Sequence, residues 1–179
     1  MRPQKKTKIA LTGGIGTGKT YVSKQFSDMG IPVFYADEEA KKLYDTKGAI
    51  AFFKEKYGDV CFTNNQLDYS KLATFVFSDL EKRKQIEAFI HPLVMQNFED
   101  WASQQDSNIV MLESAIIFEA GLEKFFDKIM VVDAPLDVRI ERIKNRNPKL
   151  SETEILQRIN SQLSQEEKCT RSDVIIWNG

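Results

Sequence analysis

The chain has 179 residues, of which 42% are hydrophobic and 28% are charged, and its formal net charge is −1. This length is typical of one folded domain, and the composition excludes disordered and collagen-like chains. The near-neutral charge excludes a general attraction to nucleic acid or to an anionic membrane, so we expect any polyanionic ligand to be bound at a local site.

The cysteines and the N-terminus narrow the class of protein further. Cys61 and Cys169 lie far apart and form no CxxC pair, so neither a disulfide framework nor a zinc site is expected. No stretch has the apolar length of a membrane span, and no signal-peptide pattern precedes the first apolar run. We therefore expect a cytoplasmic protein without nucleic-acid or membrane partners, acting as a monomer or a weak homo-oligomer.

The first apolar run, residues 8–13, predicts a strand that leads directly into a glycine-rich loop. Gly13, four further residues and then Gly18, Lys19 and Thr20 fit the phosphate-binding pattern GxxxxGK(S/T). Glycines let backbone N–H groups approach phosphates, the lysine adds a charge at the β- and γ-phosphates, and the threonine hydroxyl is placed to ligate Mg²⁺. The residues expected to bind the nucleotide are Gly13, Gly14, Ile15, Gly16, Thr17, Gly18, Lys19 and Thr20.

A helix and a second strand follow the loop. Val22, Phe26 and Met29 have helical spacing, and Gly30 ends this pattern as a helix C-cap does. The next apolar run, residues 32–37, predicts a strand neighbouring the phosphate loop, and it ends at Asp37. Ligands of parallel sheets lie at the carboxyl ends of the strands, so this carboxylate is a candidate to accept the proton of an attacking hydroxyl. Capping of the helix that follows is an alternative role, and both roles can hold.

The middle of the chain, from about residue 38 to 108, shows helical spacing and no strand signal. Its clearest pattern is formed by Ile86, Phe89, Ile90, Leu93, Val94 and Phe98. We interpret the segment as a helical insertion into a single domain whose core consists of residues 1–37 and 109–179.

The apolar runs at residues 109–114 and 128–134 predict the third and fourth strands. The guanine-reading NKxD segment of GTPases does not occur after the loop. A motor or transport ATPase needs a strand that ends in a magnesium-binding carboxylate, and Glu113 and Asp133 are the two candidates. Asp133 also fits as the cap of the next helix, which makes the ATPase interpretation less favoured without excluding it.

The helix after the fourth strand carries three arginines. Pro135 fits its first turn, Pro148 marks its end, and Val138, Ile140 and Ile143 supply its apolar contacts. Arg142 and Arg146 share one face, with Arg139 one turn earlier, and they could stabilise the charge on a transferred phosphoryl group. A solvated basic stripe is the alternative. The break and second helix that follow predict a lid over about residues 139–168.

The last apolar run, residues 173–177, completes a predicted α/β fold: a five-stranded parallel sheet flanked by helices, with a helical insertion and a lid. The sequence also resembles the dephospho-coenzyme A kinase family, whose members have the P-loop kinase fold. The resemblance lies in "LTGGIGTGKT" (11–20), "IHPLV" (90–94), "AIIFEAG" (115–121), "VVDAPLDVRIERIKNR" (131–146) and "QLSQEEKCTRSDVIIWNG" (162–179). These segments follow the family's order and spacing over essentially the whole chain.

The resemblance implies ATP-dependent phosphorylation of the ribose 3′-hydroxyl of dephospho-CoA, the last step of coenzyme A synthesis, with ATP as co-substrate and Mg²⁺ as cofactor. It implies that residues 14–20 bind ATP, that Asp37 is the base or orienting carboxylate, and that Arg142 and Arg146 contact nucleotide phosphates. The catalytic set is then Asp37, Lys19 and Arg142, with Thr20 at the metal. The helical insertion holds the pantetheine-bearing substrate.

Three further residues match family positions without a chemistry that we can assign: His91, Glu119 and Asn178, the last in a family segment near the adenine. Tyr35 departs from the family, because many relatives have an acidic residue there, so only Asp37 remains to act. Two other functions stay open: another small-molecule or nucleotide kinase on the same fold, and a P-loop NTPase switch that transfers phosphate only to water.

Overall fold

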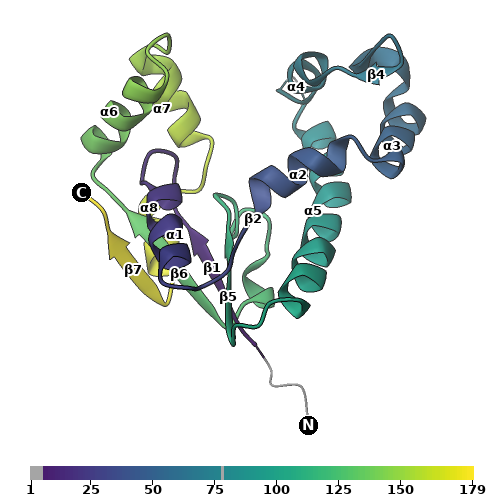
Figure 1. Cartoon of the computed structure of the whole chain (residues 1–179). Coiled ribbons are helices and arrows are strands. Elements are labelled where there is room, and N and C mark those ends of the chain that lie inside the picture. Colours follow the sequence, from purple (N-terminus) through teal and green to yellow (C-terminus); the bar gives the residue numbers. More distant parts are fainter. Residues whose placement is uncertain (1–5, 78) are drawn as a thin grey trace. The chain divides into compact units, whose positions relative to one another are not determined.

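The structure is a computed structural model, and it describes residues 6–77 and 79–179. The chain divides into two compact units. The sheet unit comprises the chain up to Tyr35 together with Ala102–Gly179, and the helical unit comprises Ala36–Trp101. Figure 1 labels the elements of both.

The sheet unit contains the predicted parallel sheet. Its elements are β1 (Thr7–Thr12), α1 (Lys19–Asp28), β2 (Val33–Tyr35), β5 (Ile109–Glu113), a 3₁₀ turn (Glu123–Phe125), β6 (Lys128–Asp133), α6 (Leu136–Arg146), α7 (Glu152–Asn160), α8 (Gln165–Thr170) and β7 (Val174–Trp177). The strand order is β2-β5-β1-β6-β7, and all neighbours are parallel. The predicted α/β class and five parallel strands are confirmed.

The strand order places β1 in the centre of the sheet, so the loop that follows it begins in the middle of the carboxyl edge. One detail of the prediction is wrong: β2 is an edge strand, and β5 separates it from β1. β2 needs only three residues because, within the described part of the chain, it pairs with β5 alone, through residues 33–35.

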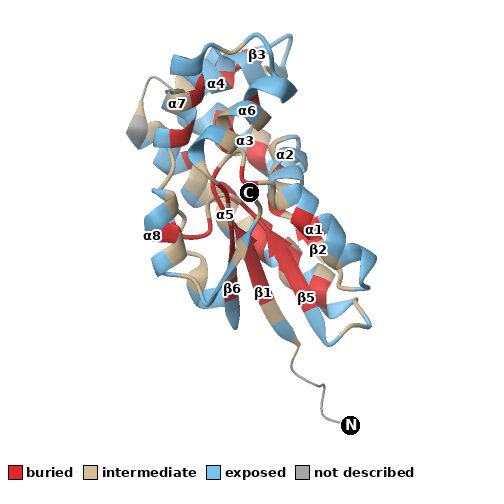
Figure 2. Cartoon of the chain, turned by 90° about the vertical axis from the view of Figure 1, so that its left-hand side faces the viewer, coloured by how far each residue is buried: buried red, intermediate tan, exposed pale blue. Residues whose placement is uncertain are grey.

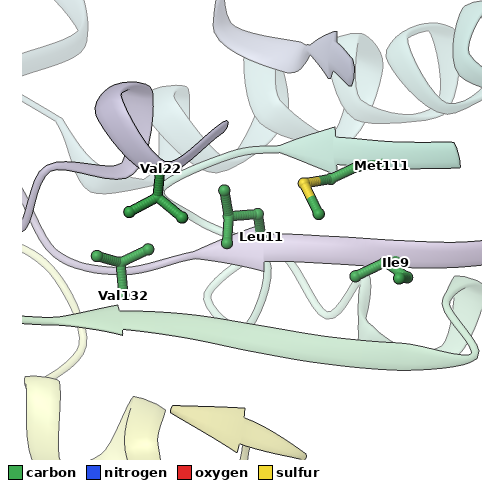
Figure 3. Packing of buried hydrophobic residues seen from close by; sticks show 5 residues of the cluster. All are labelled: Ile9, Leu11, Val22, Met111 and Val132. Carbon is green, nitrogen blue, oxygen red and sulfur yellow. The ribbon is translucent and has the colours of Figure 1, made fainter. Parts of the chain in front are cut away.

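The core of the sheet unit rests on the apolar runs that predicted the strands. The ribbons of β1, β5 and β6 are largely buried (Figure 2). On one face, Ile9 and Leu11 of β1 pack with Met111 of β5, Val132 of β6 and Val22 of α1 (Figure 3). Each buried aliphatic side chain of this kind contributes about 1.5–3 kcal/mol. The loop between β1 and α1 is therefore anchored at both ends in well-packed elements.

Three local expectations are wrong. Met29 is 68% exposed and follows the last turn of α1, so only Val22 and Phe26 of that pattern face the core. Asp133 does not cap α6, because its carboxylate accepts from the adjacent Ala134 N–H at 2.9 Å. Pro135, in extended conformation, is itself the N-cap residue, and the helix begins only at Leu136. The fixed φ of proline suits this position just before the helix.

The helical unit contains α2 (Ala36–Tyr44), α3 (Lys47–Tyr57), a 3₁₀ turn (Gly58–Cys61), β3 (Phe62–Thr63), β4 (Gln66–Leu67), α4 (Tyr69–Phe77) and most of α5 (Leu80–Ser103). The hairpin of β3 and β4 corrects the expectation that this segment has no strand. Asn64 and Asn65, both with positive φ, form its two-residue turn, which is the geometry that asparagine tolerates best. Its strands of two residues are too short to show a strand pattern.

Stacked aromatic rings hold the helical unit together: Phe52 on Phe89 at 4.1 Å between centroids and Tyr44 on Phe53 at 5.8 Å. Ring pairs of this kind add about 0.5–1.5 kcal/mol beyond the area they bury. Within the described part of the chain, no helix has both the length and the apolar character needed to cross a membrane.

Candidate active site

The glycine-rich loop lies between β1 and α1, and the N-terminus of α1 at Lys19 adds its partial positive charge to the loop. Among the described residues, the backbone N–H groups of Gly16, Gly18 and Thr20 have no hydrogen-bond partner. Unpaired amides of this kind are the donors with which such loops bind phosphate oxygens. The arrangement therefore fits an anionic ligand.

The carbonyl groups of the loop are held by side chains from other elements. Arg139 Nε donates to the Ile15 oxygen at 3.0 Å, and Asn178 Nδ2 donates to the Thr17 oxygen at 2.8 Å. The C=O and the following N–H of a trans peptide point in opposite directions. These two bonds consequently turn the N–H groups of Gly16 and Gly18 away from the side chains of Arg139 and Asn178.

Arg139 is the residue whose importance the sequence did not reveal. It is only 6% exposed, so the alternative of a solvated basic stripe does not hold for this arginine. Burial lowers the pKa of its guanidinium, and the Asp133 carboxylate partly offsets this effect. Its carbonyl, Cα and Cβ atoms also lie where a side chain on Gly16 would have to fit. We conclude that Arg139 supports the loop from beneath.

The structure brings one of the two predicted phosphate-binding arginines to the loop and not the other. Arg142 donates to the Asn178 carbonyl at 2.7 Å and more weakly to the Thr17 carbonyl at 3.4 Å. Arg146, the last residue of α6, is exposed, and it has no hydrogen bond or ion pair among the residues that the structure describes. Only Arg142 is therefore positioned by the loop itself.

Lys19 and Thr17 converge on one carbonyl group. Lys19 Nζ lies 3.4 Å from the Gly14 oxygen, and the buried Thr17 hydroxyl donates to the same oxygen at 2.9 Å. Thr20, in the first turn of α1, is exposed. The lysine is thus held against the loop, and the hydroxyl of Thr20 is open to a ligand.

Two glutamines complete the surroundings of the loop. Gly14 N–H donates to Gln165 Oε1 at 2.9 Å, and Ile15 N–H donates to Gln162 Oε1 at 2.8 Å. The side chain of Ile15 packs against Ile143, Ile155 and Ile159 of α6 and α7. The predicted lid helices thus contact the loop through both polar and apolar groups, and sequence reasoning had assigned no role to either glutamine.

Asp37 lies in the first turn of α2, two residues after the end of β2, and it is exposed. Helix α2 begins at Ala36, so Asp37 lies inside the helix and the capping alternative is wrong. Its carboxylate has no hydrogen-bond partner among the described residues. It belongs to the helical unit, and its catalytic role stays a prediction.

The family model for dephospho-CoA kinase matches residues 7–179. The chain belongs to the dephospho-CoA kinase family. It is 40% identical over 173 residues to the dephospho-CoA kinase of Bacteroides fragilis, an alignment that covers 96% of this chain and 84% of the relative. It is 38% identical over 176 residues to that of Bacillus licheniformis, with 95% and 87% covered.

Solved structures agree with membership of the dephospho-CoA kinase family. The chain superposes on a crystal structure from Thermus thermophilus with a TM-score of 0.88 and 32% identity, covering 97% of this chain and 89% of the other. For the dephospho-CoA kinase of Campylobacter jejuni the TM-score is 0.67 and the identity 26%, with 97% and 88% covered. A shikimate kinase from Bacteroides thetaiotaomicron, with a TM-score of 0.53 and 18% identity over 95% of this chain and 85% of the other, shares the fold alone. The chain is a P-loop kinase, as the sequence predicted.

The three family-matched residues have distinct surroundings in this chain. Asn178 holds the loop with its side chain, and its N–H donates to the Asp133 carbonyl at 2.8 Å. Glu119 pairs with the fully buried Lys168 at 2.7 Å. His91 is half-buried in α5, where burial lowers the pKa of its imidazole and Glu87 opposes the shift. Asn178 and Glu119 therefore stabilise the sheet unit through these contacts.

Gly13→Ala is expected to destabilise the protein by at least about 2 kcal/mol. Gly13 has φ +148°, and a Cβ there would lie 2.5 Å from the carbonyl oxygen of Val132, a backbone atom of β6 that cannot move aside. For a domain of this size the loss corresponds to a fall of about 4–8 °C in Tm, measured by thermal unfolding. Gly48→Ala is the control, because nothing lies within 4 Å of its Cβ position. Equal Tm values for the two variants would contradict the close approach of β6.

Proposed function

We propose that the chain phosphorylates the ribose 3′-hydroxyl of dephospho-CoA with ATP, giving coenzyme A and ADP. The family match over residues 7–179 carries this proposal. Binding of a nucleoside triphosphate is supported by the unpaired loop amides, the helix N-terminus and Lys19. The 3′-oxygen attacks the γ-phosphorus, the bond between that phosphorus and the β–γ bridging oxygen breaks, and ADP leaves.

The proton of the 3′-hydroxyl needs an acceptor, and we assign it to the carboxylate of Asp37. Its exposed carboxylate is not occupied by another described residue. A carboxylate in this role orients the hydroxyl and takes its proton as the new bond forms. In the sheet unit, Lys19 and Arg142 stabilise the charge that moves from the γ-phosphoryl group to ADP. Arg146 is proposed to contact the nucleotide phosphates from the lid side.

Mg²⁺ fits the donor set of the loop. The described residues contain no group of three or more His, Cys, Asp or Glu side chains that would enclose a metal. Mg²⁺ usually binds through one or two protein oxygens, substrate phosphates and waters, and the exposed hydroxyl of Thr20 is such an oxygen. When bound, the ion neutralises charge on the β- and γ-phosphates.

The helical unit is proposed to bind the pantetheine-bearing part of the acceptor. It contains a cavity of about 330 Å³, lined by apolar side chains together with Tyr44, Tyr69, Lys41 and the ion pair of Arg83 with Glu87. A long acceptor with amide groups and an adenosine diphosphate portion needs a surface of this mixed character. The division of the chain into core, insertion and lid, the cytoplasmic location and the oligomeric state stay predictions.

The decisive experiment incubates the chain with ATP, Mg²⁺ and dephospho-CoA and measures ADP and coenzyme A by chromatography. We expect the two products in equal amounts, with ADP release below about a tenth of that rate when the acceptor is left out. ADP release that does not depend on the acceptor would instead favour an NTPase switch. Turnover only with other alcohols, such as shikimate or nucleosides, would show that the acceptor is wrongly assigned.

A further inference from the structure

Two consecutive amides of the phosphate loop, those of Gly14 and Ile15, are bound by side chains almost at the other end of the sequence. Gln165 accepts from Gly14 N–H and Gln162 accepts from Ile15 N–H, across 151 and 147 residues. Gln165 is also fixed at its second end, because its Nε2 donates to the Val132 carbonyl of β6 at 2.8 Å. A side chain fixed at both ends is poorly suited to leave when a ligand arrives.

The bond to Gln162 has a consequence for the lysine of the loop. The Ile15 N–H and the Gly14 C=O belong to one trans peptide and point in opposite directions. Because Gln162 binds the N–H, the carbonyl is turned toward Thr17 and Lys19 and accepts from both side chains. The orientation of this single peptide thereby connects Gln162 to the position of the Lys19 ammonium group.

The segment that carries both glutamines is itself supported from the opposite side. Glu119 accepts from Leu163 N–H at 3.0 Å and from Lys168 Nζ at 2.7 Å. Lys168, with a side chain that is 0% exposed, also donates to the Ala115 carbonyl at 2.6 Å. Breaking a buried ion pair by removing one partner is strongly destabilising. Glu119 and Lys168 therefore fix the turn between Gln162 and Gln165.

We propose that Gln162 and Gln165 are positioning residues for ATP binding. Gln165 orients the peptide between Gly13 and Gly14, and Gln162 orients the peptide between Gly14 and Ile15, whose carbonyl contacts Lys19. Glu119 and Lys168 hold the turn that carries both glutamines. The loop is then preorganised by the end of the lid segment. The proposal deepens the proposed function, and it rests on that function only for its kinetic readout.

The test replaces each glutamine with methionine, which preserves side-chain length and removes the hydrogen bonds. Gln157→Met is the matched control, since Gln157 is an exposed residue of α7 whose side chain makes no hydrogen bond to the other described residues. Equilibrium binding of Mg²⁺·ATP is measured by calorimetry, which needs no acceptor. We expect Kd to rise about tenfold for Gln162→Met and for Gln165→Met, and less than twofold for the control.

A second measurement separates positioning from a purely structural role. In a double-mutant cycle, kcat/KM for ATP is measured for Gln162→Met, for Lys19→Met, for the double variant and for the unsubstituted chain. Because Gln162 acts through the carbonyl that Lys19 contacts, we expect the double variant to lose clearly less than the product of the two single losses. The losses of Gln162→Met and of Lys144→Met, a substitution at an exposed lysine of α6, should multiply.

Two outcomes would overturn the proposal. An unchanged Kd with a lowered Tm would mean that the glutamines only stabilise the fold. A lower Kd in the methionine variants would mean that the glutamines compete with phosphate for the loop amides. If the unsubstituted chain makes no coenzyme A while the Kd series is as expected, the proposed acceptor fails and the positioning role stands.

Discussion

Asp37→Asn is expected to lower kcat for coenzyme A formation by about a thousandfold, within the range of general-base catalysis. Asparagine preserves the size of the side chain and can still bind the 3′-hydroxyl, but it cannot take up the proton. The ATP-binding loop belongs to the other unit and is held by Arg139, Asn178 and the two glutamines. KM for ATP should therefore change less than twofold, which steady-state kinetics at varied ATP will measure.

Glu38→Gln provides the matched control for Asp37→Asn. Both side chains are exposed carboxylates in the first turn of α2, so each loss removes the same favourable interaction with the helix dipole, about 0.3–1 kcal/mol. The two variants should have similar Tm values, while only Asp37→Asn loses kcat. If Asp37→Asn forms coenzyme A at nearly the original rate, or if Glu38→Gln is equally slow, the proton acceptor is a different group.

The features that the sequence predicted correctly have local causes. Apolar runs such as residues 109–113 and 128–133 need burial on both faces, and that requirement is met by a parallel sheet. The glycine spacing around Gly13 and Gly18 is likewise local, because positive φ angles and close backbone approaches allow no other residue there. Strands, loop and following helix were therefore visible in short windows of sequence.

The errors arose where local signals compete or are too short. Aspartate is a common N-cap residue, so Asp133 was a reasonable candidate. Pro135 takes the N-cap position instead, α6 begins at Leu136, and the Asp133 carboxylate accepts from the Ala134 N–H. The β3–β4 hairpin has two residues a strand, so its only clear signal was the pair Asn64 and Asn65. Strand order was not accessible either, because nothing local shows that β5 inserts between β1 and β2.

The supports of the candidate site could not be predicted from spacing. Arg139 and Arg142 lie on one helix with the spacing of a solvent-exposed stripe, and only the packed structure shows that the first is buried beneath the loop. Gln165 is 151 residues from its partner Gly14, and glutamine has no motif that marks it as a backbone ligand. Such contacts depend on tertiary packing, which determines where the ends of distant elements meet.

Lys19→Met is expected to reduce kcat/KM for ATP by about 10²–10³-fold, the usual cost of removing one donor that stabilises transition-state charge. Methionine keeps the apolar stem of the side chain and removes only the ammonium group. The loop should keep its shape, because Thr17 still donates to the Gly14 carbonyl through both its hydroxyl, at 2.9 Å, and its N–H, at 3.3 Å. Tm should therefore stay within about 2 °C of the original, a shift that corresponds to no more than about 0.5–1 kcal/mol.

Lys24→Met is the control, because Lys24 lies on the same helix, its side chain is 72% exposed, and its one ion pair among the described residues is with Asp28. Exposed pairs of this kind contribute about 0–1 kcal/mol, so this variant should keep its kcat/KM.

A comparison of ATP with AMP binding tests the role of Lys19 more directly. The Lys19 charge acts on the β- and γ-phosphates, so calorimetry should show a larger loss of affinity for ATP than for AMP. Equal losses for both nucleotides would mean that Lys19 shapes the loop instead of binding the terminal phosphates, and the charge stabilisation would then have to come from Arg142.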